Sequence, residues 1–216
     1  MAVRTFRWSP SARSSLLVWM MPPYSKKWTP PTSVNSGREA TVASRGAFFM
    51  AKIVVDSSAL ILLAKCGLIE KLCDSYQIVA PSSVIDEVAS ENMIKRFPDA
   101  AIIADLISNS KIKEQNPETV DLQLPVTLGQ GETDALFLAR ELKNSIFATD
   151  DDKAIKASRF FKISFIVAPR IVAEMFRLKK ISYQSAKQAI EKLAIIGRYP
   201  PDIIANALLT LEEDKK

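Results

Sequence analysis

The chain has 216 residues, of which 48% are hydrophobic and 25% charged, so it can form one ordinary globular domain with a sizeable core and an additional segment. It carries 29 Lys and Arg residues against 24 Asp and Glu, a net charge of +5. It contains no histidine, which excludes catalysis by an imidazole base and every zinc site that needs a histidine ligand.

Residues 1–49 differ in composition from the rest of the chain. They hold seven of the 29 basic residues and one of the 24 acidic residues, so the remainder carries 22 basic and 23 acidic side chains and is nearly neutral. They contain all three tryptophans and show no helical or strand periodicity. We interpret this segment as a disordered extension or a mis-assigned start, because Met50 leads directly into the first predicted strand; a targeting segment and a basic RNA-binding arm are the alternatives.

After residue 50, segments with strand character alternate with segments of helical periodicity. The predicted strands are residues 52–56, 77–80, 111–114, 145–149 and 163–168. The predicted helices are residues 58–65, 68–72, a helix starting at 81–83, then 97–108, 129–143, 152–161, 170–178, 182–196 and 202–211. Ser83 and Asp86 have the spacing of a capping box. The alternation predicts an α/β domain in residues 50–180, with a central parallel sheet covered on both faces, followed by a C-terminal helical extension in residues 181–216.

Acidic residues occur at four places where an apolar strand ends or the next helix begins. They are Asp56, Glu87, the pair Glu132 and Asp134, and the run of Asp150, Asp151 and Asp152. In an open α/β sheet, ligands bind outside the carboxyl ends of the strands. Carboxylate oxygens are the ligands that suit Mg²⁺ and Mn²⁺. The pattern therefore predicts a metal site of the kind that cleaves phosphodiester bonds.

Each acid taken singly also has a structural explanation, because the first turn of a helix favours Asp and Glu. Asp56 fits this explanation less well, since it ends an apolar strand and Ser57 and Ser58 already offer hydroxyls to cap the next helix. Clustered carboxylates also raise each other's pKa and cost stability unless a cation compensates them. Together, the four acidic clusters favour one metal site over four unrelated helix starts. For Glu132 two roles are possible: an acid that stabilises the first turn of its helix, or a residue that supports the metal ligands.

The ordered set of acidic sequences resembles the motifs of PIN-domain nucleases, and most closely those of the prokaryotic toxin–antitoxin type. The motifs are Val-Val-Asp-Ser-Ser-Ala-Leu with Asp56, Pro-Ser-Ser-Val-Ile-Asp-Glu-Val with Glu87, Gly-Gln-Gly-Glu-Thr-Asp-Ala-Leu with Asp134, and Ala-Thr-Asp-Asp-Asp-Lys-Ala with Asp151. The resemblance runs from Lys52 to Leu178. It implies a three-layer α/β/α sandwich in which these four acids are catalytic and bind the metal.

The resemblance also implies an activity and partners. It implies endonucleolytic hydrolysis of RNA with Mg²⁺ or Mn²⁺ as the cofactor, a homodimer, and inhibition by a protein antitoxin. The family's last motif has the form Thr-x-Asp, which selects Asp151 after Thr149. Because three acids follow one another here, Asp150 and Asp152 are alternative metal ligands.

Three basic residues follow the last acidic motif. Lys153, Lys156 and Arg159 are three residues apart within the predicted helix 152–161, so they share one helix face. We interpret them as candidate contacts for RNA phosphates. A solvated helix face is the alternative interpretation.

Two other classes of protein fit parts of this pattern. A PIN-like fold can act without catalysis, as a scaffold or an RNA-binding module. A phosphoacceptor receiver domain also has an Asp at a strand end, but receivers carry an acidic pair after the first strand and a lysine after the last. Here a single Asp ends the first strand, and Ala168-Pro169 follow the last one, so the receiver interpretation is disfavoured.

The two cysteines, Cys66 and Cys73, are too few for a zinc cluster. We interpret them as reduced thiols in a cytoplasmic protein. The apolar run at residues 16–21 is far shorter than the roughly 20 residues that span a bilayer, so we expect no membrane partner.

Overall fold

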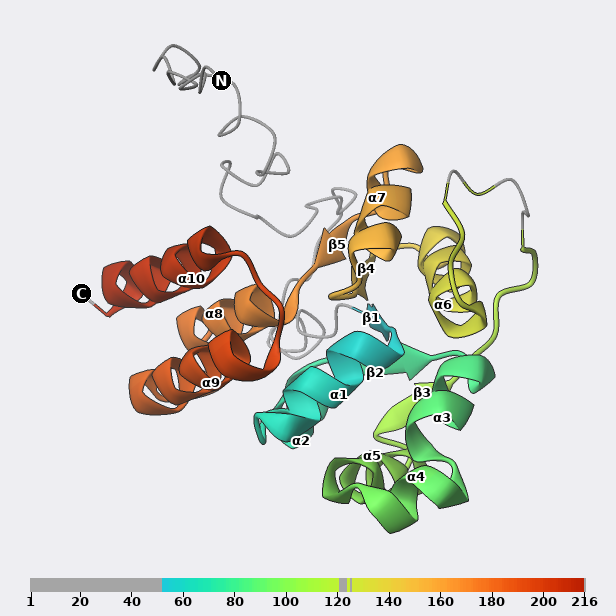
Figure 1. Cartoon of the computed structure of the whole chain (residues 1–216), viewed down its shortest axis with the longest axis horizontal. Coiled ribbons are helices and arrows are strands. Elements are labelled where there is room, and N and C mark those ends of the chain that lie inside the picture. The colour runs from blue at the N-terminus through green and yellow to red at the C-terminus, as the bar shows by residue number, and fades with distance from the viewer. Residues whose placement is uncertain (1–51, 121–123, 125, 216) are drawn as a thin grey trace, which may run out of the picture. The chain divides into compact units, whose positions relative to one another are not determined.

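The structure, a computed structural model, describes residues 52–120, 124 and 126–215, and the predictions for residues 1–49 lie outside this part. Its centre is a sheet of five strands (Figure 1). They are β1 (Lys52–Val55), β2 (Gln77–Ala80), β3 (Ile112–Glu114), β4 (Ser145–Ala148) and β5 (Phe165–Ile166). The strand order is β3-β2-β1-β4-β5, and each neighbouring pair is parallel. This confirms the predicted α/β class and its central parallel sheet.

The helices follow the strands in the predicted alternation. They are α1 (Ser57–Lys65), α2 (Ile69–Ser75), α3 (Ser82–Ala89), α4 (Glu91–Arg96), α5 (Pro98–Ser108), α6 (Gln130–Glu141), α7 (Asp152–Phe160), α8 (Ala168–Arg177), α9 (Tyr183–Ile196) and α10 (Pro201–Asp214). The sequence does not predict α4, whose side chains are all at least partly exposed and give no apolar face to recognise. Within the described ranges, no helix has the length and apolar character needed to cross a membrane.

Helices cover both faces of the sheet. Parallel strands need right-handed crossovers, which place α1 and α3 to α5 on one face as the chain moves outward from β1 to β3. The chain then returns to β4 and continues to β5, so α6 and α7 cover the opposite face. The fold is therefore the expected α/β/α arrangement, with α8 packed against α1.

Buried apolar residues make up the strands of the sheet. Successive side chains of a strand point to opposite faces of the sheet, and helices cover both faces. Side chains that follow one another along a strand are therefore both buried, and the exposed fraction is at most 1% for Val54, Val55, Ile78 and Val79. The register pairs Val54 with Val79 on one side, and β1 with β4 in parallel on the other. The strands therefore end at the same edge of the sheet.

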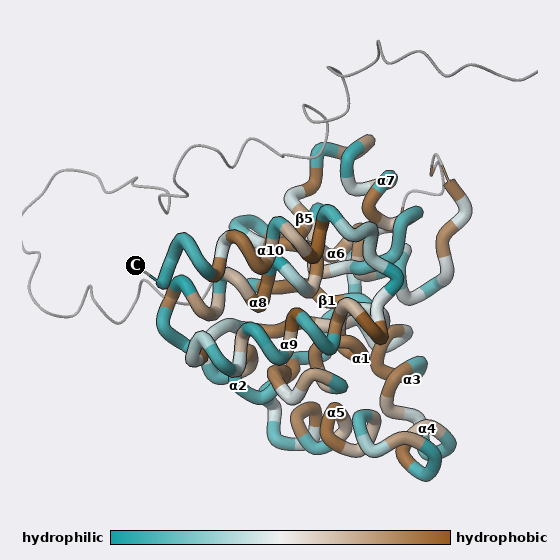
Figure 2. The backbone as a smooth tube through the Cα atoms, turned by 60° about the vertical axis from the view of Figure 1, so that its left-hand side comes forward, coloured by the Kyte–Doolittle hydropathy of each residue, from teal (hydrophilic) through white to brown (hydrophobic). Residues whose placement is uncertain are grey.

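The C-terminal helices share the core of the sheet domain. α9 and α10 both pack against α8 and against each other, and Figure 2 shows these three helices side by side with α1 next to α9. Ile190, Leu193 and Leu211 belong to the same buried cluster as the strand residues. The predicted boundary after residue 180 thus falls between α8 and α9, two helices that pack against each other.

Two local expectations are wrong. The capping box of Ser83 and Asp86 does not form, because the N-cap of α3 is Pro81, which has no polar side chain to accept from the helix. The last strand is shorter than residues 163–168, because α8 already begins at Ala168 with Pro169 in its first turn.

The two cysteines are free thiols. Cys66 is partly buried and Cys73 is buried. Burial raises the pKa of the Cys66 thiol to about 11 and that of Cys73 to about 12, so both carry their protons at neutral pH.

Replacing a core residue of α9 tests whether the C-terminal helices stabilise the whole domain. Ile190 is fully buried, so Ile190→Ala should lower the free energy of unfolding by about 2–5 kcal/mol in one cooperative transition. Ile195, on the same helix, is 83% exposed, and Ile195→Ala should change stability by less than about 0.5 kcal/mol. Denaturant unfolding of both variants measures this, and equal small effects would contradict a shared core.

Candidate active site

The predicted acids lie around the point where the sheet changes direction. From β1 the chain crosses to β2 on one side, and from β4 it crosses to β5 on the other, so β1 and β4 flank the switch point at which open α/β sheets bind ligands. The register pairs Val55 with Ala148, which places the next residues, Asp56 and Thr149, side by side beyond the strand ends. The backbone N–H of Asp56 donates to the carbonyl of Ala148 at 3.1 Å.

The Asp56 side chain is fully buried and accepts three hydrogen bonds. Ser58 Oγ and the Ala59 N–H donate to Oδ1 at 2.7 and 2.9 Å, and Thr149 Oγ1 donates to Oδ2 at 2.5 Å. Asp56 is therefore itself the N-cap of α1, whereas the sequence suggests that Ser57 and Ser58 do the capping. Ser58 instead donates to the carboxylate and helps to fix its orientation.

Burial dominates the titration of Asp56. Removal from water raises the pKa of this carboxyl to about 7, although the hydrogen bonds from Ala59, Thr149 and Ser58 favour the charged form. The nearby charge of Asp150 raises the pKa slightly further. A cation beside Asp56 would have the opposite effect and stabilise the ionised carboxylate.

Asp150 is the second acid at this point of the sheet, and its side chain is partly buried. Its backbone N–H donates to Ser58 Oγ at 2.9 Å, and its Oδ1 accepts from the Ala168 N–H at 3.0 Å and from the Tyr199 hydroxyl at 2.5 Å. Its Oδ2 is buried and has no hydrogen-bond partner among the residues that the structure describes. Burial raises the pKa of this carboxyl to about 6. A buried carboxylate oxygen without a donor is destabilising, and a hard cation is the kind of group that would satisfy it.

The other two acids of the run lie at the start of α7. Asp151 is the N-cap of α7, and its Oδ1 accepts from the N–H groups of Lys153 and Ala154, both at 2.8 Å. Asp152 is exposed in the first turn of α7. Among the three, Asp150 is the acid whose charge acts on Asp56. The motif form alone favours Asp151, and the choice between the two as a metal ligand stays a prediction.

Glu87 and Asp134 lie across the contact between α3 and α6. Ser83 Oγ on α3 donates to Asp134 Oδ2 at 2.6 Å, and Gln130 Nε2 donates to Oδ1 at 2.8 Å. One turn along α3, the exposed Glu87 side chain lies over Gly131 of α6. A Cβ added to Gly131 would be 2.9 Å from Glu87 Oε1, so glycine permits this close approach.

The structure thus places the predicted acids in two groups, with Asp56 and Asp150 at the strand ends and Glu87 and Asp134 on the contacting helices α3 and α6. Within the described part of the chain, no three carboxylates or thiols are close enough to hold a metal ion as they stand. Protein donors already hold the carboxylates of Asp56, Asp134 and Asp151. Glu132 accepts from the Gly129 N–H at 2.7 Å, which is the first-turn role weighed for it.

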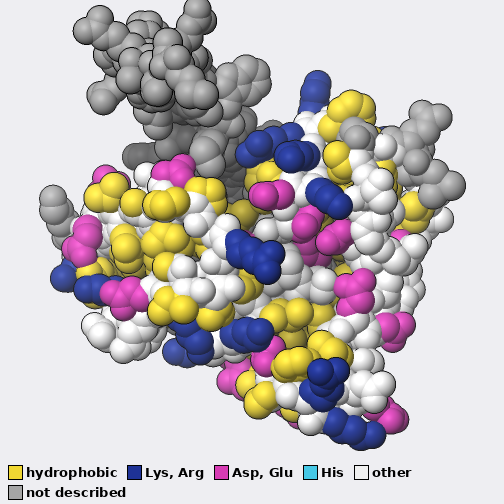
Figure 3. All heavy atoms as spheres, in the orientation of Figure 1, with side chains coloured by type: hydrophobic (Ala, Val, Ile, Leu, Met, Phe, Trp, Pro, Cys, Tyr) yellow, Lys and Arg dark blue, Asp and Glu magenta, His cyan; other side chains and the backbone are white. Residues whose placement is uncertain are grey.

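The basic candidates lie on the exposed side of α7. Lys153, Lys156 and Arg159 are all exposed, and Figure 3 shows basic side chains around α7 next to acidic ones nearer the middle of this face. The Arg159 guanidinium lies 5.6 Å from the centre of the Phe165 ring, a cation–π distance. Because α7 begins directly after Asp151, these three basic residues belong to a helix that starts at the same edge of the sheet as the acids.

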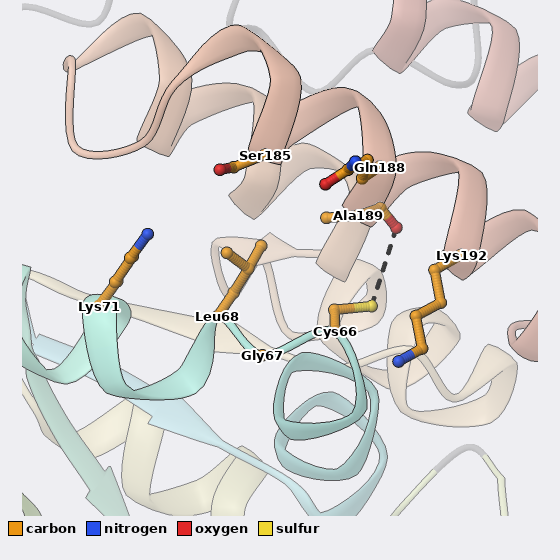
Figure 4. A pocket seen from close by; sticks show the side chains of 8 residues that line it. All are labelled: Cys66, Gly67, Leu68, Lys71, Ser185, Gln188, Ala189 and Lys192. Carbon is orange, nitrogen blue, oxygen red and sulfur yellow. Dashed lines mark hydrogen bonds between the residues drawn. The ribbon is translucent and has the colours of Figure 1, made fainter.

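The cavity drawn in Figure 4 is separate from the acids. It has a volume of about 270 Å³ and lies between the α1–α2 turn and α9. Its lining residues include Cys66, Lys71 and Lys192, and none of the described residues that line it is an Asp or Glu. It does not belong to the acidic site.

Fold and site together define an α/β protein with carboxylates at the switch point of a parallel sheet, where open α/β sheets bind ligands. A family model described as a PIN domain matches residues 52–213, and the chain therefore belongs to the PIN-domain family. PIN domains are generally nucleases. A search among curated proteins returned no match.

The raised pKa of Asp56 predicts how stability depends on pH when EDTA is present. The folded-state pKa is about 7 and the unfolded value about 3.9, so between these values the folded protein keeps a proton that the unfolded chain has lost. The stabilisation that the protonated Asp56 gives the folded state is therefore fully present below about pH 4 and is lost as the pH rises to about 7. Its size is at most about 1.4 kcal/mol for each unit by which the folded and unfolded pKa values differ.

The measurement is the free energy of unfolding of the wild type and of Asp56→Asn at several pH values. The variant should gain stability relative to the wild type as the pH rises from about 4 to about 7, because asparagine has no charge to bury. A difference that stays constant over this range would contradict the raised pKa.

Proposed function

We propose that this PIN-domain protein is a divalent-metal-dependent endoribonuclease that hydrolyses phosphodiester bonds of RNA. The observation that carries the proposal is the pair of acids at the switch point, Asp56 and Asp150. Asp56 is fully buried with a pKa raised to about 7, and the neighbouring Asp150 has a buried Oδ2 that accepts no hydrogen bond. Such a pair costs stability as it stands and fits the donor set of Mg²⁺ or Mn²⁺.

Asp56 and Asp150 would hold the metal ion, and Glu87, Asp134 and Asp151 are the further candidates for ligands and catalytic residues. A bound divalent ion supplies Lewis acidity and lowers the pKa of water. Ser58 and Thr149 fix the Asp56 carboxylate by direct donation at 2.7 and 2.5 Å, so its oxygens are oriented before substrate binds. Ser83 and Gln130 orient Asp134 in the same manner.

RNA is the substrate favoured by the motif resemblance. The exposed Lys153, Lys156 and Arg159 on α7 would contact phosphates beside the acids. The role as the toxin of a toxin–antitoxin pair, with a protein antitoxin and a homodimeric state, rests on the same resemblance. Since the chain has no histidine, no imidazole can serve as a general base, and the carboxylates of the site are the candidates for this role.

A scaffold or RNA-binding role is the second candidate. The observation that favours it is the pairing of the acids: within the described residues, no group of three is ready to hold a metal ion. In this alternative Asp56 and Asp151 act as the N-caps that they are in α1 and α7.

A cleavage assay separates the two candidates. The wild type should cut single-stranded or structured RNA with Mg²⁺ or Mn²⁺ and not with EDTA. The variants Asp56→Asn and Asp134→Asn should each lose more than ~100-fold in cleavage activity, because ~100-fold is the most that loss of a residue supporting the ligands typically costs. Glu91→Gln is the matched control, because the Glu91 side chain is 92% exposed on α4. Folded wild-type protein that binds RNA but never cuts it would support the scaffold role.

The Gly131 contact offers a test of Glu87. In Gly131→Ala the new Cβ must displace the flexible end of Glu87, while alanine favours the helix by about 0.5–1 kcal/mol. We expect unchanged or higher stability together with a loss of about 10- to 100-fold in cleavage, as for a catalytic group displaced by about 1 Å.

The background variant Glu87→Gln provides the control for this substitution. If Gly131→Ala acts by moving Glu87, it should cost little further activity in that background. Full activity of Gly131→Ala would argue that the position of Glu87 does not matter for cleavage.

A further inference from the structure

One donor to the acidic site comes from the C-terminal part of the chain. The Tyr199 hydroxyl donates to Asp150 Oδ1 at 2.5 Å across 49 residues of sequence. Tyr199 lies between α9 and α10, and its ring packs against the main core. The second donor to the same oxygen, the Ala168 N–H at 3.0 Å, belongs to the backbone, so Tyr199 is the side chain that holds this carboxylate.

The path of α9 explains how Tyr199 reaches the site. The Cys66 thiol at the end of α1 donates to the carbonyl of Ala189 in α9 at 3.7 Å, as the dashed line in Figure 4 marks. Ten residues later Tyr199 reaches Asp150, whose N–H binds Ser58 at the start of α1. α9 therefore runs antiparallel to α1 and carries the chain from the end of α1 back to its first turn.

Gly197 makes room for the Tyr199 ring. A Cβ added to Gly197 would collide with the Cδ2 and Cε2 atoms of that ring. The glycine is the C-cap of α9 and has an ordinary negative φ, so space and not backbone conformation requires it. The position of the ring therefore depends on a residue outside the acidic site.

The hydrogen bonds from Tyr199 continue to Asp56. Asp150 donates its N–H to Ser58 Oγ at 2.9 Å, and Ser58 donates its hydroxyl to Asp56 Oδ1 at 2.7 Å. With both donors on Oδ1, the other oxygen of Asp150 is the buried one without a partner. Tyr199 and the Ala168 N–H thus both hold Oδ1 and leave Oδ2 of Asp150 to a ligand.

We propose that Tyr199 is a positioning residue of the acidic site, which holds Asp150 so that its Oδ2 can bind a divalent cation together with Asp56. This inference rests on the proposed metal-dependent function. It makes the docked C-terminal helices α9 and α10 a requirement for tight metal binding. Loss of the hydroxyl should weaken the metal site while the ring keeps its packing.

The test measures Mn²⁺ affinity by titration calorimetry on the full chain, with thermal unfolding as the control for folding. Tyr199→Phe should bind Mn²⁺ about 10- to 100-fold more weakly, the usual cost of losing a residue that orients a ligand. Gly197→Ala, which displaces the ring, should show the same direction of change. Tyr183→Phe is the matched control, since Tyr183 donates to Glu212 within the same pair of helices and should leave the affinity unchanged.

The outcomes separate this inference from the proposed function. Wild-type affinity in Tyr199→Phe, or an equal loss in Tyr199→Phe and Tyr183→Phe, would overturn the positioning role even if the wild type cuts RNA. A wild type that binds no Mn²⁺ would overturn both proposals. Weaker Mn²⁺ binding in Tyr199→Phe alone supports the positioning role, and in that case a wild type that never cuts RNA would contradict only the nuclease function.

Discussion

The burial of one carboxyl group, that of Asp56, is the constraint on which the rest of the site depends. The parallel register of β1 and β4 places Asp56 beside Thr149 at the strand ends, and helices cover both from solvent. A charge removed from water in this way is tolerated only with close donors, and Ser58, Ala59 and Thr149 provide them. These donors lower the energy of the ionised form but do not restore the usual pKa, which is what makes a cation an effective partner.

The same residues serve the fold and the proposed chemistry. Asp56 caps α1 and Asp151 caps α7, so each acid has a structural role that would survive without catalysis. The unsatisfied Oδ2 of Asp150 has no such role, because it neither caps a helix nor accepts a hydrogen bond. It is the part of the site that structural needs alone do not explain, and it lies where the C-terminal segment meets the end of β4.

The sequence predicts what depends on local pattern. Apolar runs mark the strands, and the acids that follow them mark the edge where a site forms, so the sheet and the positions of Asp56 and Asp150 are predictable. Contacts between distant segments are not. Ser83 has the spacing of a cap but donates to Asp134, 51 residues away, and Tyr199 reaches Asp150 only because α9 docks along α1. The pairing of the acids likewise depends on which donors surround each one.

The most direct test of the account is to locate Mn²⁺ in crystals of the protein by its anomalous scattering. The account predicts a bound ion in contact with the Asp56 carboxylate and with Asp150 Oδ2, the two buried groups that a cation would stabilise. An ion bound only at exposed carboxylates, with the hydrogen bonds of Asp56 and Asp150 unchanged, would contradict it.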